Sequence, residues 1–275
     1  MKRVAFAVPT LLIAFVLLHA ATITSSRISG LGRGEGLNRS GQIVEQSVGG
    51  EATSTWIYSN GERTPVRVPG SESTVGFGID DTGRVVGYYT ESRTGHQHGF
   101  LYSQGSFSPI EVADSFATFP RGINNSGQVA GYIYRSAGTA GFIYDGGTYK
   151  LVRVPGANST FLLGINNLGD TVGYYSDATR PHGFLYDRSG TLKVIDVPGS
   201  RSTTLNGIDS QGTIAGTFID ARQHEHAFSY TTSGVFTTID APGAAGKLGT
   251  VARSINDLGQ ILIQGSDHFL VNVAP

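Results

Sequence analysis

The chain has 275 residues, with 20 Lys and Arg against 21 Asp and Glu, a formal net charge of −1 and no cysteine. A near-neutral chain without a basic run is poorly suited to binding nucleic acid or an anionic membrane surface. The missing thiols exclude disulfides and zinc–thiolate sites. The 39 glycines are about twice the usual share of ~7 %, and the 15 % of charged residues is below the usual ~25 %. This composition favours short strands and tight turns.

The first residues have the pattern of a secretory signal peptide. Lys2 and Arg3 precede an uncharged apolar run, Val4–Leu18, and small alanines follow it. The run is shorter than the ~20 residues that a membrane-spanning helix needs. We therefore predict a cleaved signal peptide over residues 1–20, with an uncleaved membrane anchor as the alternative.

The rest of the chain, residues 21–275, is expected to form one repeat domain without a membrane span. A three-residue phrase, Gly-Ile-Asn or a close variant, occurs six times, and each copy is followed by a glycine. The phrases begin at Gly36, Gly78, Gly122, Gly164, Gly207 and Ser254, 42 to 47 residues apart. A period of this length indicates a copied supersecondary unit whose copies bury their apolar faces against one another.

The copy that begins at Gly164 shows the unit most clearly. Asn-Asn-Leu-Gly forms a tight turn at its start. Four segments rich in β-forming residues follow, at 170–175, 182–186, 192–197 and 202–208. Apolar residues lie on both faces of these strands, which is typical of a propeller blade packed between two neighbours.

The two ends of the chain complement each other. The last copy has strands at 260–264 and 268–273 and lacks the next one, whereas residues 21–30 precede the first copy. We predict an all-β fold, a six-bladed β-propeller of four-stranded blades, whose last blade is closed by the N-terminal strand. A non-closed stack of small β-sheets is the alternative.

The recurring elements Gly-Ile-Asn-Asn-x-Gly-x-Val-x-Gly-Tyr and His-Gly/Ala-Phe-Leu-Tyr resemble the bacterial extracellular repeat family named for its His-Ala-Phe (HAF) motif. The motif appears here at His98, His182 and His226. Thr139–Phe142 in the third copy has no histidine, and the first copy has Ser54–Trp56 at this place. The resemblance implies an exported repeat protein with a propeller-like array. It implies no activity and no catalytic residue.

The three motif histidines are the most prominent titratable residues. Equivalent positions in different blades lie too far apart for one metal ion, whose ligands must approach to ~2.0–2.1 Å. We therefore expect each to hydrogen-bond a neighbouring loop, and no metal site. An acid precedes each histidine by a few residues, at Glu91, Asp177 and Asp220 respectively. No nucleophile or metalloprotease signature accompanies these pairs, so no catalytic residues are assigned.

Two other patterns are interpreted as structural. The Asn-Asn-x-Gly turns lack the alternating carboxylates of a calcium loop, and turn chemistry accounts for their residues. One position in the strand before Pro-Gly, which is Ala113-Asp114 in the second copy, carries a charge in five successive copies: Arg67, Glu111, Arg153, Asp196 and Asp240. We interpret these charges as groups that keep an outer strand soluble, with pairing between adjacent blades as the alternative.

The polar loop from Thr217 to His226 is the best candidate for a binding site. In a propeller it lies on the same rim as the equivalent loops of the other copies, where ligands usually bind. The candidate binding residues are His98, His182, Asp220, Arg222, His224 and His226.

The sequence therefore predicts a secreted or periplasmic, monomeric binding scaffold without a cofactor. Its ligand is expected outside the cytoplasm and is a carbohydrate or a protein, not a nucleic acid. One alternative is an enzyme, a hydrolase or lyase acting on a polysaccharide in the central cavity, and another is a structural envelope component. Because turn geometry explains the repeated residues, function is expected where the copies differ.

Overall fold

The computed structural model describes residues 22–47, 53–242 and 249–274, and the predicted signal peptide over 1–20 lies outside these ranges. All regular elements within them are β-strands. In the described part of the chain, no helix is long and apolar enough to cross a membrane. The expected all-β fold is confirmed.

The described strands pair into six four-stranded antiparallel units that follow one another along the chain. The first three units are β2 (Arg33–Leu37), β3 (Ile43–Gln46), β4 (Thr55–Ser59) and β5 (Glu62–Val66); β6 (Ser71–Ile79), β7 (Val85–Glu91), β8 (Gln97–Ser103) and β9 (Ser106–Ile110); and β10 (Ala117–Ile123), β11 (Val129–Arg135), β12 (Gly138–Asp145) and β13 (Thr148–Val152). The last three are β14 (Ser159–Ile165), β15 (Thr171–Ser176), β16 (Pro181–Tyr186) and β17 (Leu192–Val194); β18 (Ser202–Ile208), β19 (Ile214–Ile219), β20 (Glu225–Tyr230) and β21 (Phe236–Ile239); and β22 (Val251–Ile255), β23 (Gln260–Gln264), β24 (His268–Ala274) and β1 (Thr22–Ile28).

The second, third and fourth units are also joined to one another. A single parallel bridge links Gln97 to Ala117, and another links Thr139 to Ser159. These two bridges make a continuous path of 12 strands from three units that are otherwise separate antiparallel sheets.

The sixth unit contains both ends of the described chain. β1 pairs with β24 along its whole length, from Thr22 opposite Ala274 to Ile28 opposite His268. The strand expected over 21–30 therefore occupies the outer position that the last copy lacks.

The boundaries of the repeated copy needed two corrections. The strand expected over 202–208 pairs with β19, so it is the first strand of the next unit and not the last of its own. The strand expected over 192–197 ends at Val194. Asp196 explains this end, because its Oδ1 accepts the Gly183 N–H at 3.1 Å in place of a backbone carbonyl.

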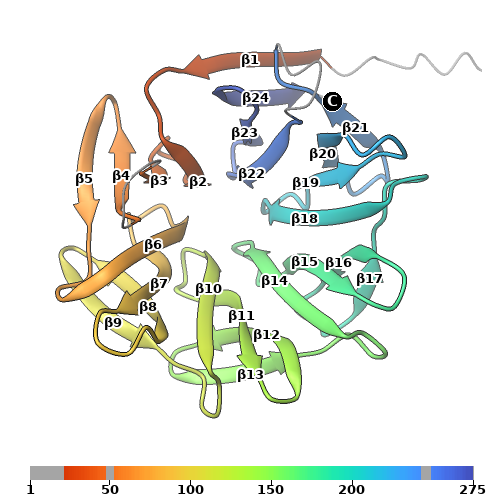
Figure 1. Cartoon of the computed structure of the whole chain (residues 1–275). Coiled ribbons are helices and arrows are strands. Elements are labelled where there is room, and N and C mark those ends of the chain that lie inside the picture. The colour runs from red at the N-terminus through yellow and green to blue at the C-terminus, as the bar shows by residue number, and fades with distance from the viewer. Residues whose placement is uncertain (1–21, 48–52, 243–248, 275) are drawn as a thin grey trace, which may run out of the picture.

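The units are arranged around a common axis, with the first strand of each nearest the centre (Figure 1). Each first strand packs against those of the neighbouring units, and β2 lies against both β6 and β22. Six apolar clusters fill the spaces between consecutive units. The largest fully buried side chains in them are Phe100, Phe142, Phe184 and Phe228. Burial of such a side chain contributes roughly 1.5–3 kcal/mol.

The phrase glycines allow the first strands to approach closely at the axis. A Cβ on Gly164 would lie 2.9 Å from Gly207 Cα, and one on Gly122 would lie 3.1 Å from Gly164 Cα. Because both neighbours are backbone atoms, a side chain has no room at these positions.

The phrase asparagines do more than shape turns. Asn166 Oδ1 accepts the Asp170 N–H within its own turn, as turn chemistry predicts. Its Nδ2 donates to Asp209 O in the next unit at 3.0 Å. Asn124 makes the equivalent bond to Asn166 O. The interpretation that turn geometry alone explains these residues was therefore incomplete, since they also connect neighbouring units.

Each first strand carries a β-bulge immediately before its phrase glycine, where the register shifts by one residue. We call the six unpaired residues the inner-strand bulge residues: Glu35, Phe77, Arg121, Leu163, Asn206 and Arg253. A bulge re-aims the side chain of its extra residue. Here all six line a cavity at the centre of the ring.

Candidate functional site

The three motif histidines occupy equivalent positions and share the same surroundings. Each ring stacks on an aromatic side chain of the preceding strand. For His182 this is Tyr175, with ring centroids 5.1 Å apart, and for His226 it is Phe218, at 5.0 Å. His98 stacks on Tyr89 at 5.3 Å. The histidines thus belong to the packing of their own units.

Each imidazole also meets a carboxylate from the segment after the fourth strand. His182 Nδ1 lies 2.7 Å from Asp196 Oδ2, and His226 Nδ1 lies 2.8 Å from Asp240 Oδ1. The third pair joins His98 Nδ1 to Glu111 Oε1 at 3.0 Å. Burial raises the pKa of the Glu111 carboxyl, and the nearby His98 opposes that shift. These contacts lie within one unit, so pairing between adjacent blades was the wrong alternative for these three acids.

The sign of the charge at this position therefore depends on whether the copy has the motif histidine, which the solubility interpretation does not explain. Copies with the motif histidine carry an acid there, whereas the first and third copies, which lack it, carry Arg67 and Arg153. Arg153 Nη1 donates to Ala137 O instead.

The loop before each histidine adds a second carboxylate on the other side of two of the rings. His182 Nε2 lies 3.3 Å from Asp177 Oδ2, and His226 Nε2 lies 3.5 Å from Asp220 Oδ2. Hydrogen bonds from Thr179 and Arg180 lower the pKa of Asp177 to about 2. We call this arrangement, an imidazole between two carboxylates, the histidine clamp.

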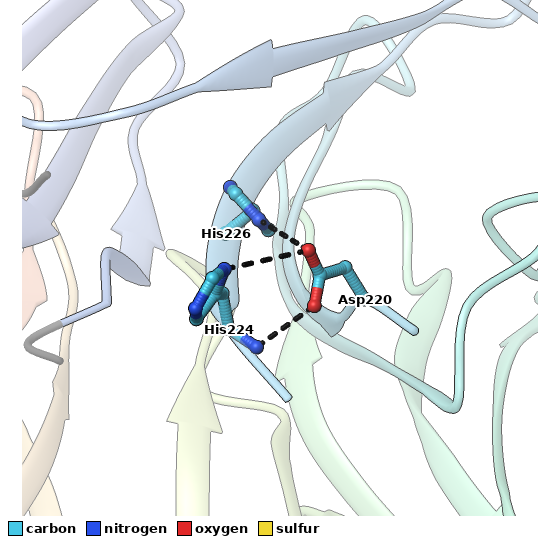
Figure 2. Close-up of side chains that lie close together, drawn as sticks. All are labelled: Asp220, His224 and His226. Atoms are coloured by element: carbon cyan, nitrogen blue, oxygen red, sulfur yellow. Dashed lines mark hydrogen bonds and ion pairs between the residues drawn. The ribbon is translucent and has the colours of Figure 1, made fainter. Parts of the chain in front are cut away.

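Three of the predicted binding residues, Asp220, His224 and His226, lie close together in the fifth unit (Figure 2). Asp220 and His224 are in the loop between β19 and β20, as is Arg222, and His226 is in β20. Asp220 Oδ1 accepts the backbone N–H groups of Arg222 and His224, both at 2.8 Å. Its other oxygen, Oδ2, faces His226 and also His224 Nδ1, at 3.6 Å. Hydrogen bonds from the His224 and Arg222 backbone lower the pKa of Asp220. His98 and His182 lie in other units and do not join this cluster.

A second group of polar residues, which sequence reasoning missed, lies at the axial cavity. The cavity measures about 90 Å³ and is lined by the inner-strand bulge residues together with the phrase residues that follow them. Three of the six bulge residues are charged: Glu35, Arg121 and Arg253. They come from different units: the arginine occurs in the third and sixth copies, and the glutamate in the first alone of the six.

Glu35 is the most unusual of these residues. Its side chain is only 4 % exposed, and Oε1 has no hydrogen-bond partner among the described residues. Arg33 Nε approaches Oε1 to 2.5 Å but without hydrogen-bond geometry, and Arg253 Nη1 lies 3.9 Å from Oε2. Burial lowers the pKa of Arg253, and the charge of Glu35 opposes this. Oε1 is thus ion-paired with Arg33 but accepts no hydrogen bond from the described residues, and a buried carboxylate oxygen in this state can still accept one.

Arg121 is the least constrained of the three charges. Its guanidinium lies over the Phe77 ring, 3.6 Å from the centroid, and no ion pair to it occurs among the described residues. Its charge acts on three nearby tyrosines of the second, third and fourth units: Tyr88, Tyr132 and Tyr174. Burial raises the pKa of Tyr132 to about 12 despite that charge. The tyrosines are therefore neutral hydrogen-bonding groups at physiological pH.

These tyrosines belong to an arc of rings in contact across three units. Tyr88 meets Phe119 edge-on at 5.0 Å, Phe119 stacks on Tyr132 at 4.9 Å, and Tyr132 meets Phe161 at 4.9 Å. Tyr134, which is 41 % exposed, meets Phe119 at 5.2 Å and extends the arc to the surface. Phe116, which is 69 % exposed, is joined to Tyr134 by a backbone hydrogen bond. Phe77, which lines the axial cavity, meets Tyr88 at 6.0 Å and so connects the cavity to this arc.

One signal in the sequence points to this site. The residue before each repeated phrase is different in nearly every copy, while the phrase itself barely changes. The expectation that function lies where the copies differ was applied to the loops and not to this position.

No protein-family model and no curated protein sequence matches the chain. Among solved structures, it is similar to a protein described as TolB from Agrobacterium tumefaciens, with 12 % identity, 89 % of this chain and 91 % of that chain covered, and a TM-score of 0.64. It is also similar to TolB from Acinetobacter baumannii, with 11 % identity, 81 % of this chain and 61 % of that chain covered, and a TM-score of 0.58. A gluconolactonase from Xanthomonas campestris has 13 % identity, with 93 % of this chain and 91 % of that chain covered, and a TM-score of 0.52. At these identities the likeness shows the β-propeller fold alone.

Proposed function

We propose that this protein is an exported, six-bladed β-propeller of the HAF-repeat type that binds a ligand at its axial cavity. In this proposal the six four-stranded units are the blades, and β1 completes the last of them. The secreted or periplasmic location rests on the signal-peptide pattern of residues 1–20. The observation that carries the binding role is the convergence of Glu35, Arg121 and Arg253, three residues that break the repeat, on the axis.

The charges indicate the chemistry of the ligand. Arg121 and Arg253 offer guanidinium donors, which bind carboxylates well. Glu35 Oε1, which lies beside Arg33 Nε but accepts no hydrogen bond from the described residues, offers an acceptor for a hydroxyl hydrogen. A ligand that carries both a carboxylate and hydroxyl groups satisfies both kinds of partner. Aromatic faces at Tyr134 and Phe116 favour a ring that stacks on them, and these three properties together describe an acidic sugar.

The size of the cavity limits how such a ligand enters. A space of about 90 Å³ holds a few water-sized groups, enough for a carboxylate and not for a whole sugar ring. In this proposal the acidic group enters the cavity while the sugar ring stays outside it.

Calorimetric titration with an oligogalacturonate tests this proposal, and the same oligosaccharide with its carboxylates methyl-esterified is the control. We expect binding of the acid form only. Arg121→Met keeps the bulk over Phe77 but removes the charge, and it should weaken binding by about tenfold or more. Arg222→Met, an exposed change on the rim, should leave binding unaltered. Equal binding of acid and ester, or of neither, would contradict the proposed ligand class.

The polysaccharide-acting enzyme stays the second candidate, because a buried carboxylate at the axis is also a feature of a general acid or base. Incubation with the same polymer distinguishes the two. If the protein produces new reducing ends or unsaturated sugar ends, and Glu35→Gln abolishes this activity, the protein is an enzyme and not a binding scaffold.

A further inference from the structure

We propose a binding site for a divalent transition-metal ion of the Zn²⁺ type in the fifth unit, with Asp220 Oδ2, His224 Nδ1 and His226 Nε2 as its protein ligands. One ligand atom from each of these residues lies within 4.8 Å of the other two. The site is separate from the axial cavity, and it revises the expectation that the histidines hold no metal. That expectation considered equivalent histidines in different units, whereas these ligands come from one loop.

The spacing fits a tetrahedral ion. Ligand atoms ~2.0–2.1 Å from a tetrahedral centre are about 3.3 Å from one another. Asp220 Oδ2 lies 3.5 Å from His226 Nε2 and 3.6 Å from His224 Nδ1. A side-chain movement of a few tenths of an ångström brings these two edges to the required length. His224 is half exposed, so a water molecule can supply the fourth ligand.

The contact of His226 with Asp240 orients the imidazole for metal binding. Its Nδ1 lies 2.8 Å from Asp240 Oδ1, so a neutral ring places its single N–H there and leaves the Nε2 lone pair directed at Asp220. Two acceptors, the lone pair and the carboxylate, then face each other at 3.5 Å. A cation between them removes the repulsion, and a carboxylate behind a histidine ligand is the usual outer partner of zinc.

Asp220 is equally well prepared. The backbone N–H groups of Arg222 and His224 hold Oδ1, which turns Oδ2 toward the two rings (Figure 2). The ring of His226 is held by stacking on Phe218. Only His224 has to be ordered on binding, so most of the entropy cost of assembling the site has already been met.

The other two motif histidines are natural controls, because the surroundings of each lack one part of the site. The fourth unit has Asp177 and His182, but Arg180 stands where the fifth unit has His224. The second unit has His96 two residues before His98, with ring centroids 6.4 Å apart, close to the 6.5 Å between His224 and His226. Its acid, Glu91, is bound by Thr94 Oγ1 and does not group with the two rings.

Calorimetric titration of the purified protein with Zn²⁺, after treatment with a chelator, tests the site. We expect one equivalent to bind, and His224→Ala should weaken this binding by tenfold or more. The matched change His96→Ala should leave it within about twofold, since it removes a histidine of the same exposure and spacing outside the site. Asp240→Asn should weaken binding by about 10-fold or more, as outer partners of metal ligands do.

Two further measurements keep the proposal open to refutation. The melting temperature of each variant without metal should equal that of the unaltered protein, because His224 and Asp240 are exposed at the rim. Lowering the pH from 7 to 5 should weaken Zn²⁺ binding, because protons compete for the imidazoles. Equal losses in His224→Ala and His96→Ala, or no binding to the unaltered protein, would overturn the assignment.

Discussion

Asn256 Nδ2 donates a hydrogen bond of 3.0 Å to Asn38 O, 218 positions earlier in the chain. The bond repeats the contact that Asn124 makes to the next unit, but it joins the last unit to the first. It is buried, and Asn256 Oδ1 is occupied by its own turn, where it accepts the Gln260 N–H. One side chain therefore shapes a turn and connects the two ends of the array.

Asn256→Asp separates these two roles. The aspartate retains the turn acceptor but loses the donor and places a carboxylate against Asn38 O. We expect the free energy of unfolding to fall by roughly 1–3 kcal/mol, measured by urea denaturation. Leu258→Ala, an exposed change in the same turn, should alter it by less than ~0.5 kcal/mol. Equal effects of the two changes would show that the inter-unit bond contributes nothing.

Gly164→Ala should destabilise the protein through overpacking at the axis. The added Cβ would lie 2.9 Å from Gly207 Cα and 3.1 Å from Asn206 O, and both are backbone atoms that cannot rotate away. We expect a loss of about 1–3 kcal/mol. The last copy already has a Cβ at this position, in Ser254, so Ser254→Gly should cost less than about 1 kcal/mol. A neutral Gly164→Ala would mean that the inner strands can separate.

His268 should make stability depend on pH. Burial lowers the pKa of His268, with a further contribution from Arg253, and Gly34 N–H donates to its Nε2 at 3.3 Å. In the unfolded chain the ring takes up its proton near ~6.5, whereas in the folded protein it does so only at lower pH. The unfolded state therefore binds more protons in this range, and stability falls as the pH drops below about 6.5.

The test compares urea denaturation at pH 7 and pH 5. His268→Gln keeps a hydrogen-bond acceptor but cannot titrate, so its stability should decrease less between the two pH values than that of the unaltered protein. His96→Gln, on an exposed loop, should leave the difference unchanged. If His268→Gln has the full pH dependence, other groups cause it.

Asp196→Asn should destabilise the fourth unit more than Glu111→Gln destabilises the second. Asp196 accepts from Arg180 Nη2 at 2.8 Å, from His182 Nδ1 and from the Gly183 N–H, and its side chain is 20 % exposed. Glu111 is 44 % exposed, and among the described residues its carboxylate contacts the imidazole of His98 but no arginine and no backbone N–H. We expect about 1–3 kcal/mol for the first change and below ~1 kcal/mol for the second. Equal losses in thermal unfolding would contradict this ranking.

Period and turn chemistry made most of the fold predictable. The expected strand over 260–264 matches β23, and the expected N-terminal strand became β1, because hairpin turns and β-forming residues are local signals. The assignment of 202–208 to its own copy was wrong, since a sequence period has no fixed starting point. Only the pairing of β18 with β19 shows where one sheet ends.

Whether a site could be predicted from the sequence also depended on whether its residues are close together in the chain. Asp220, His224 and His226 lie within seven residues and were found, because one loop holds them together. Glu35, Arg121 and Arg253 are spread over three copies and meet only through the ring, so local spacing gives no sign of them. The acids opposite the histidines were misread for the same reason, since each lies 13 or 14 residues away across a hairpin.

The pairing of β1 with β24 has a consequence for how the chain folds. Five of the units can form from consecutive residues, but β1 has no partner until the residues of β24 have been synthesised. The first described segment must therefore wait unpaired for the last, and closing so long a loop is slow compared with forming a hairpin. The formation of the sixth unit is thus expected to be the late step of folding. A chain that ended after β23 would keep all six first strands but leave β23 without its outer neighbours β24 and β1.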